Sequence, residues 1–494
     1  MAKGEIRSDH LDTLDHDLGR YSNIELATQY AGRPLVGYGF ALAFLLLAGV
    51  AALTFSTPGS HAMTLGAAAV FAGYLALNIG ANDVANNMGP AVGARVLTMG
   101  GAIAIAAVFE SAGALIAGGD VVDTVAGGII PPGAIADPRI FVRVMMAALL
   151  SAAIWVNIAT RAGAPVSTTH AIVGSIAGAG IAAAGWGAVA WETMLSITLG
   201  WVVSPLLGGM IAAAVLWVIK ARIIYREDKI AAARTWVPVL VGVMGGAFAC
   251  YLALKGLNRL AVVGFAPALS LGCAAGMALW IGTIPVIRKQ SEGLENRDKS
   301  LKRLFGLPLI VAAALLSFAH GANDVANAVG PLAAILKATT TGLTGGIAVV
   351  PAWDMFIGAF GISLGLILFG PRLIRMVGSR ITRLNPMRAY CVALSAAVTV
   401  ILASGLGIPV STTHVAVGAI FGVGFFREWY EARRLRRSSA SVANRPPLAV
   451  EERRRRKLVR RSHFLTIMAA WIVTVPAAGV LSGLVFMAMG LAGD

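Results

Sequence analysis

Long apolar stretches separated by short clusters of charge constrain this chain more than any other feature of its sequence. A helix needs about 20 apolar residues to cross a bilayer, and many segments approach or exceed that length. They are 36–56, 63–94, 101–118, 141–160, 165–184, 194–219, 236–254, 259–287, 308–336, 353–370, 388–408, 409–426 and 464–490. Charged residues make up only 13% of the chain, against about 25% in soluble proteins. We therefore predict an all-α polytopic membrane protein with about 11–13 membrane segments.

The net charge of +16 is concentrated in a few segments. Residues 427–461 hold thirteen Lys or Arg against four acidic residues, and loops 220–234, 288–303 and 372–388 are also basic. Short basic loops are typical of the cytosolic side of a membrane and attract anionic lipids. This pattern predicts membrane lipids and no nucleic acid as partners. It also predicts a protein integral to the plasma membrane (the inner membrane of a bacterium) with a cytosolic N-terminus.

Two motifs occur twice, in the same order. Gly80–Asn86 (GANDVAN) recurs identically 241 residues later as Gly321–Asn327, and Pro165–His170 (PVSTTH) recurs 244 residues later as Pro409–His414. Two identical matches at nearly the same offset indicate an internal duplication. The predicted organisation is a cytosolic tail (1–35), a first span (36–62), repeat 1 (63–219), connecting spans and basic loops (220–307), and repeat 2 (308–494) with a basic cytosolic insert (427–463).

The two repeats are expected to have opposite orientations. With the basic loops inside, segment 63–94 runs from outside to inside, whereas segment 308–336 runs from inside to outside. Inverted repeats with broken or re-entrant helices place a substrate site near the middle of the membrane and permit alternating access.

The GANDVAN motif predicts a cation or proton site. A carboxylate at membrane depth costs at least ~2.5 kcal/mol and needs a partner, and carboxylate and amide oxygens suit sodium. Flanking Gly and Pro suggest a local break in each helix. The alternative is that these residues only cap or connect helices. The candidate cation or coupling residues are Asn82, Asp83, Asn86, Asn323, Asp324 and Asn327.

The PVSTTH motif predicts an anion site. Proline disfavours helix at the preceding residue, and Ser and Thr are favoured N-caps. A helix should therefore start at each hydroxyl cluster, and its free N–H groups would attract an anion. The alternative is that the hydroxyls merely cap buried helices. The candidate anion-binding residues are Ser167, Thr168, Thr169, Ser411, Thr412 and Thr413.

Other polar residues in apolar segments are lesser candidates. Glu110 is costly to bury and is a further candidate for function. His320 is matched by Ile79 in the first repeat, so it lacks a duplicated counterpart. The histidines that end the PVSTTH motifs receive no assigned role.

These four motif copies resemble those of the inorganic phosphate transporter (PiT) family of cation–phosphate symporters. The resemblance covers both repeats and implies an inverted-repeat helical fold, phosphate as substrate, and sodium or proton as coupling ion, with no other cofactor. Within that family the motif forms are closer to those of sodium-coupled members. The resemblance also implies that Asn82, Asp83, Asn323 and Asp324 bind the cation and that the duplicated Ser and Thr residues contact phosphate.

Two other functions remain to be weighed. A symporter of another oxyanion, such as sulfate, would use the same helix N-termini, since these sense charge and shape. A membrane enzyme acting on a phosphorylated lipid would need one asymmetric catalytic site, which two symmetric motif copies do not suggest. The sequence therefore indicates a transporter and not an enzyme. It leaves open a homodimer and both coupling ions.

Overall fold

A computed structural model of the chain describes residues 35–55, 61–256, 263–346, 350–380, 384–439 and 461–491. Most of the predicted cytosolic tail and residues 440–460 of the predicted insert lie outside these ranges. Residues 427–439 of that insert continue α14 as regular helix.

The described residues form helices and no strands, which confirms the predicted all-α fold. Eleven of the helices are long and apolar enough to cross a membrane. They are Leu35–Phe55, α2 (Ala62–Gly93), α3 (Met99–Ala117), α5 (Pro138–Ala162), α7 (Trp191–Ile219), α8 (Lys229–Lys255), α9 (Phe265–Ser291), α11 (Gly306–Thr341), α12 (Ala352–Arg380), α13 (Pro386–Gly405) and α16 (Arg461–Leu491). Shorter helices include α4 (Gly119–Asp123), α6 (Thr168–Ala184) and α10 (Asp298–Leu304), and α14 spans Thr412–Ser439.

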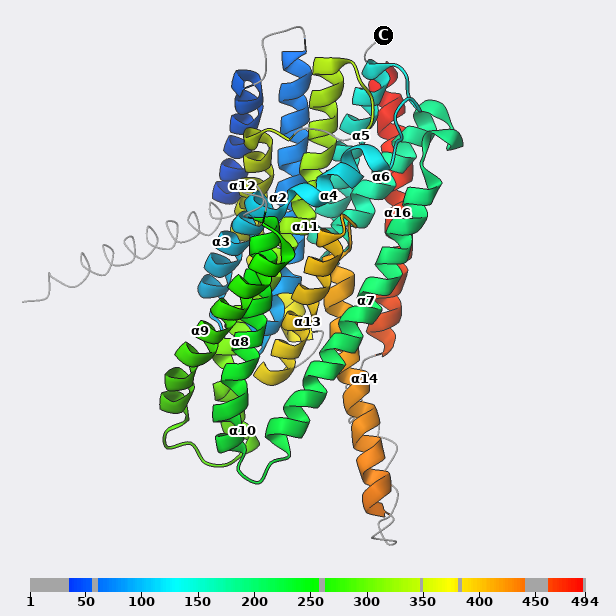
Figure 1. Cartoon of the computed structure of the whole chain (residues 1–494). Helices are drawn as coiled ribbons and strands as arrows, with labels where there is room; N and C mark the ends of the chain where they lie inside the picture. Colours follow the sequence, from blue (N-terminus) through cyan, green and yellow to red (C-terminus); the bar gives the residue numbers. More distant parts are fainter. Residues whose placement is uncertain are drawn as a thin grey trace, which may run out of the picture.

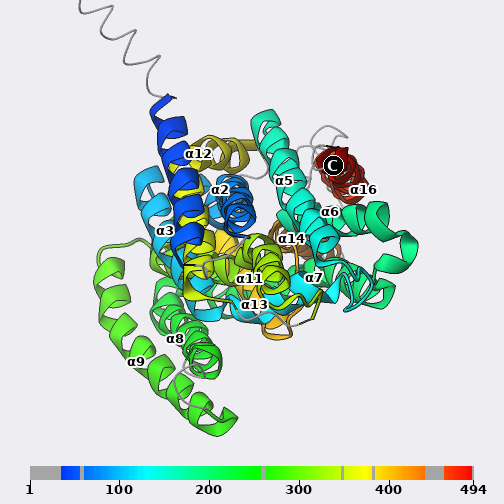
Figure 2. The same ribbon diagram turned by 90° about the horizontal axis from the view of Figure 1, so that it is seen from above.

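The helix α11 lies at the centre of the bundle (Figure 2). Its most apolar window is 89% buried, whereas that of α9 at the periphery is only 17% buried. Because α9 exposes so much apolar surface, it suits contact with lipid rather than water. Helix α10 and the far end of α14 lie at the same end of the bundle (Figure 1).

Both PVSTTH motifs start a helix, as predicted. Helix α6 begins at Thr168, and the Ser167 hydroxyl accepts a hydrogen bond from the backbone N–H of His170. The Ser411 hydroxyl accepts the same bond from His414 at the start of α14. In Figure 1, α6 occupies the upper half of the bundle and α14 runs downward from its middle. The two N-terminal ends therefore meet from opposite directions.

The predicted break at the GANDVAN motifs is wrong, because α2 and α11 run through them as continuous helices. The motif glycines serve close packing instead. A Cβ at Gly80 would collide with the backbone of Ile362 on α12, and one at Gly321 would collide with the backbone of Glu110 on α3. Each motif helix thus packs tightly against a helix from the other repeat, so the two repeats interlock.

Candidate functional site

Asp83 and Asp324 meet at the centre of the bundle, although they come from different repeats. Both side chains are buried, and His320 lies between them. Its Nε2 atom lies 3.0 Å from an oxygen of Asp324 and 3.8 Å from an oxygen of Asp83. The duplicated carboxylates therefore share one site rather than forming two separate ones.

The threonine hydroxyls of both PVSTTH motifs reach these carboxylates. Thr168 donates to Asp83 at 2.9 Å and also lies 3.4 Å from Asp324. Thr412 donates to Asp324 at 3.4 Å, and Thr413 donates to Asp83 at 3.2 Å. The predicted anion-binding and cation-binding residues thus contact each other directly.

Two amides join the motifs across the repeats. Asn86 donates to the Thr413 hydroxyl at 2.8 Å, and Asn327 donates to the Thr169 hydroxyl at 3.3 Å. In addition, Asn86 donates to Asp83 at 3.3 Å. The same cross-repeat contact therefore occurs twice, which is the pattern expected of an approximate twofold relation between the repeats.

Asn323 holds the non-helical segment between α13 and α14 in place. Its amide nitrogen donates to the carbonyl of Val410 at 2.8 Å, and its oxygen accepts from the Ser404 hydroxyl at 3.2 Å. Asn82 makes the equivalent contacts when its amide nitrogen faces Val166 at 3.2 Å and its oxygen accepts from Thr160 at 2.8 Å. Each asparagine thus connects its neighbouring aspartate to the non-helical segment that precedes α6 or α14.

The first residue of each hydroxyl cluster has a different role from the threonines. The Ser167 and Ser411 hydroxyls cap α6 and α14, so they preserve the helix starts. The capping interpretation holds for these two serines. Thr168, Thr412 and Thr413 point their hydroxyls at the carboxylates instead. The Thr169 hydroxyl donates to the carbonyl of Val410 at 3.2 Å.

Glu110 extends the polar cluster on the α3 side. Its Oε1 accepts from Asn87 at 2.8 Å and lies 3.3 Å from Nδ1 of His320. The Oε2 of Glu110 and the amide oxygens of Asn87 and Asn327 are buried and accept no hydrogen bond from any residue that the structure describes. Buried acceptors without donors are costly, and a bound cation would satisfy them.

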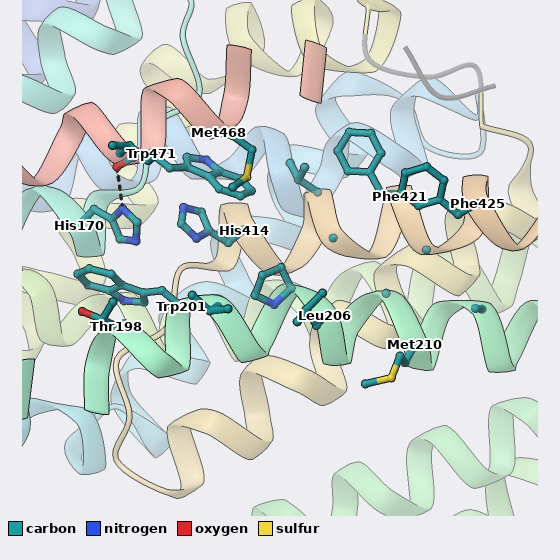
Figure 3. A pocket seen from close by; sticks show the side chains of 18 of the residues that line it. His170, Thr198, Trp201, Leu206, Met210, His414, Phe421, Phe425, Met468 and Trp471 are labelled. Atoms are coloured by element: carbon teal, nitrogen blue, oxygen red, sulfur yellow. Dashed lines mark hydrogen bonds between the residues drawn. The ribbon is translucent and has the colours of Figure 1, made fainter. Parts of the chain in front are cut away.

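The histidines that end the PVSTTH motifs pack among aromatic rings. Figure 3 shows His170 and His414 between Trp201 and Trp471. The ring centroids are 3.8 Å apart for His170 and Trp201, and 3.6 Å apart for His414 and Trp471. These rings close the inner end of an apolar groove of about 1010 Å³ between α7, α14 and α16. We assign these histidines to packing.

Comparison with known proteins identifies the architecture. The sequence profile of the phosphate transporter family matches residues 79–482. The chain belongs to the phosphate transporter family. A Helicobacter pylori (strain J99) relative, assigned as a phosphate permease, is 44% identical over 96% of this chain and 99% of its own length. A relative from Pyrococcus horikoshii with the same assignment is 36% identical over 85% of this chain and 96% of its own length.

A solved structure supports the same family membership. The structure described as the sodium-dependent phosphate transporter is 33% identical to this chain, with a TM-score of 0.77, and the match covers 87% of this chain and 99% of that one. The resemblance derived from the motifs is therefore confirmed, as is the helical membrane architecture. A member of the phosphate transporter family is a transporter and not an enzyme.

Sequence reasoning missed several residues that this family member brings to its centre. His320 received little weight because Ile79 stands at the equivalent position, yet its imidazole touches three carboxylates. Its position next to the motif in an apolar segment was the available signal. Thr160 and Ser404, which hold the motif asparagines, occupy equivalent positions 244 residues apart and could have been found by extending the repeat alignment.

Proposed function

We propose that this protein is a sodium-coupled phosphate symporter with one composite site built from both repeats. The observation that carries the proposal is the convergence of all four motif copies on Asp83 and Asp324. Its support from known proteins is the match to a structure described as the sodium-dependent phosphate transporter.

Sodium would be held by oxygen atoms at the two equivalent ends of the cluster. One end offers Asp83, Asn86 and Thr413, which already contact one another. The other offers Asp324 and the unpaired amide oxygen of Asn327. Carboxylate, amide and hydroxyl oxygens are the hard ligands that hard cations prefer. This chemistry favours sodium over a softer ion.

Phosphate would be held where the N-terminal ends of α6 and α14 meet. Helix N-termini present free N–H groups and partial positive charge to an anion. The neighbouring carboxylates would repel phosphate unless cations neutralise them. The binding of sodium and phosphate should therefore be mutually dependent, which is the thermodynamic basis of symport.

Transport would follow from rocking of one repeat against the other around this site. We propose repeat 1 as 63–219 and repeat 2 as 308–494, with 220–307 as connecting spans. We also propose that the basic end of the bundle, with α10, faces the cytosol.

Uptake of radiolabelled phosphate into proteoliposomes tests the function. We expect accumulation driven by an imposed sodium gradient, with little competition from excess sulfate. Uptake driven only by a proton gradient would contradict sodium coupling, and uptake abolished by sulfate would move the substrate to another oxyanion.

A further inference from the structure

The duplication allows the two sides of the central site to be compared position by position. On α3, Gly113 lies against the backbone of Phe318, and on α12, Gly365 lies against the backbone of Leu77. Since Phe318 follows Leu77 by the motif offset of 241 residues, Gly113 and Gly365 are equivalent. The offset between α3 and α12 is therefore 252 residues.

At equivalent positions near the ends of these helices, the two repeats carry different charges. The equivalent pairs are Asp120 with Arg372, Asp123 with Arg375, and, by the 244-residue offset of the second motif, Gly405 with Arg161. One side of the site thus carries two acidic residues where the other side carries three arginines. The approximate symmetry of the backbone does not extend to this chemistry.

On the acidic side, direct contacts join the neighbouring helices and loop. Lys255 on α8 forms a 2.7 Å ion pair with Asp120 and donates to the carbonyl of Gly405 at 3.3 Å. The Thr124 hydroxyl donates to the carbonyl of Gly407 at 2.7 Å. These contacts connect α8, α4 and the turn that follows α4 to the end of α13 and the loop that leads into α14.

The basic side holds a pocket of about 770 Å³ between the first helix, α2, α5 and α12. Arg161, Arg372 and Arg375 line it, and all three are exposed. None of the described residues that line this pocket is acidic. Among the described residues, the walls of this cavity therefore supply no acidic counter-charge to the guanidinium groups.

The inner wall of this pocket reaches the central site. Thr160 lines the pocket and also bonds the amide of Asn82, the neighbour of Asp83 in the motif. Asn78 and Asn157, joined by a 2.8 Å hydrogen bond, add polar groups to the same wall. The Thr160–Asn82 contact thus links the pocket wall to the central site.

We propose that this pocket is a second binding site, for a phosphoryl anion. Arginine binds phosphate oxygens through paired N–H donors and remains charged at every physiological pH. The anion is either inorganic phosphate on its way out of the central site or the phosphate of a lipid headgroup. A role of this pocket in phosphate release rests on the proposed function, whereas the binding of a phosphoryl anion to its arginines does not. Because Arg161 belongs to α5 and Arg372 to α12, the two repeats hold the anion jointly.

Equilibrium binding of radiolabelled phosphate to the full chain in phosphatidylcholine nanodiscs tests this proposal, with and without sodium. The test variant is Arg161→Gln with Arg372→Gln. The control variant is Arg226→Gln, which removes one arginine charge from an exposed position outside the pocket. A parallel series adds phosphatidylglycerol and measures the lipid retained through purification by mass spectrometry.

We expect two classes of bound phosphate, one of which is weaker and independent of sodium. The double variant should weaken this class about tenfold, as expected for the loss of charge-assisted hydrogen bonds, while Arg226→Gln leaves it unchanged. If phosphatidylglycerol displaces this class and is retained less by the double variant, the occupant is a lipid headgroup. If it does not, the occupant is inorganic phosphate.

The proposal is overturned if neither phosphate nor lipid binding distinguishes the double variant from Arg226→Gln. If the unmodified chain shows no sodium-dependent binding of phosphate, that is a separate result. It would contradict the proposed function and leave the arginine site to be judged by the sodium-independent class alone.

Discussion

Asn86 donates a 2.8 Å hydrogen bond to Thr413, a residue 327 positions further along the chain. The contact joins the GANDVAN motif of one repeat to the PVSTTH motif of the other. Its counterpart joins Asn327 to Thr169 at 3.3 Å. Neither repeat can therefore complete the site alone, and a change in one repeat should disturb ligands supplied by the other.

Replacing Asp83 with Asn should abolish sodium-driven phosphate uptake. The substitution keeps the size of the side chain but removes the charge that sodium would neutralise. Uptake into proteoliposomes under a sodium gradient measures the effect, with Asp298→Asn as control, because Asp298 forms an exposed ion pair away from the site. Normal accumulation by the Asp83 variant would remove this carboxylate from the coupling site.

Replacing Thr412 and Thr413 with Val should weaken phosphate binding by about tenfold or more while the protein still folds. Valine preserves the branched shape but removes two hydroxyl donors. Thr340→Val is the matched control, since the Thr340 hydroxyl bonds carbonyls of its own helix and is exposed, away from the site. An unchanged apparent affinity for phosphate in the double variant would contradict the anion-site assignment.

His320 should act by positioning the carboxylates. Its imidazole nitrogens lie close to Glu110, Asp83 and Asp324. We expect His320→Ala to lower the apparent sodium affinity and His320→Gln to restore much of it, because an amide can donate a hydrogen bond but cannot carry a proton. Titration of uptake with sodium provides the readout. If Gln is as defective as Ala, a hydrogen-bonding role is wrong and a protonation role is favoured.

Gly321 should not tolerate a larger side chain. A methyl group there collides with the Glu110 backbone, and overpacking of this kind costs about 1–3 kcal/mol or more. We expect Gly321→Ala to lower the thermal stability of the purified protein. Gly282→Ala on α9 is the control, since among the described residues no atom outside the adjacent backbone of α9 lies within 4 Å of a Cβ at this position. Equal melting temperatures for the two variants would show that the α3–α11 contact relaxes easily.

The helix starts at Thr168 and Thr412 could be predicted from sequence because they depend on local chemistry. Proline excludes helix before it, and a serine hydroxyl satisfies the first free N–H groups. Both causes act within a few residues, so the pattern specifies the structure without knowledge of the rest of the fold.

The continuity of α2 and α11 could not be predicted in the same way. A glycine in a helix indicates either a break or a close contact, and only the partner backbone decides which applies. For Gly80 that partner is Ile362 on a helix of the other repeat. The role of His320 could not be predicted for a related reason. This residue is present in one repeat only, so comparison of the repeats does not single it out.

The composite nature of the site is tested most directly by counting sodium-dependent phosphate binding in variants changed in one repeat only. Purified Asp83→Asn and Asp324→Asn would each be titrated with radiolabelled phosphate at saturating sodium, beside the unmodified chain. One site shared by both repeats predicts that either change removes the whole sodium-dependent capacity. If each variant keeps half of the capacity, the repeats bind phosphate independently and the shared site is wrong.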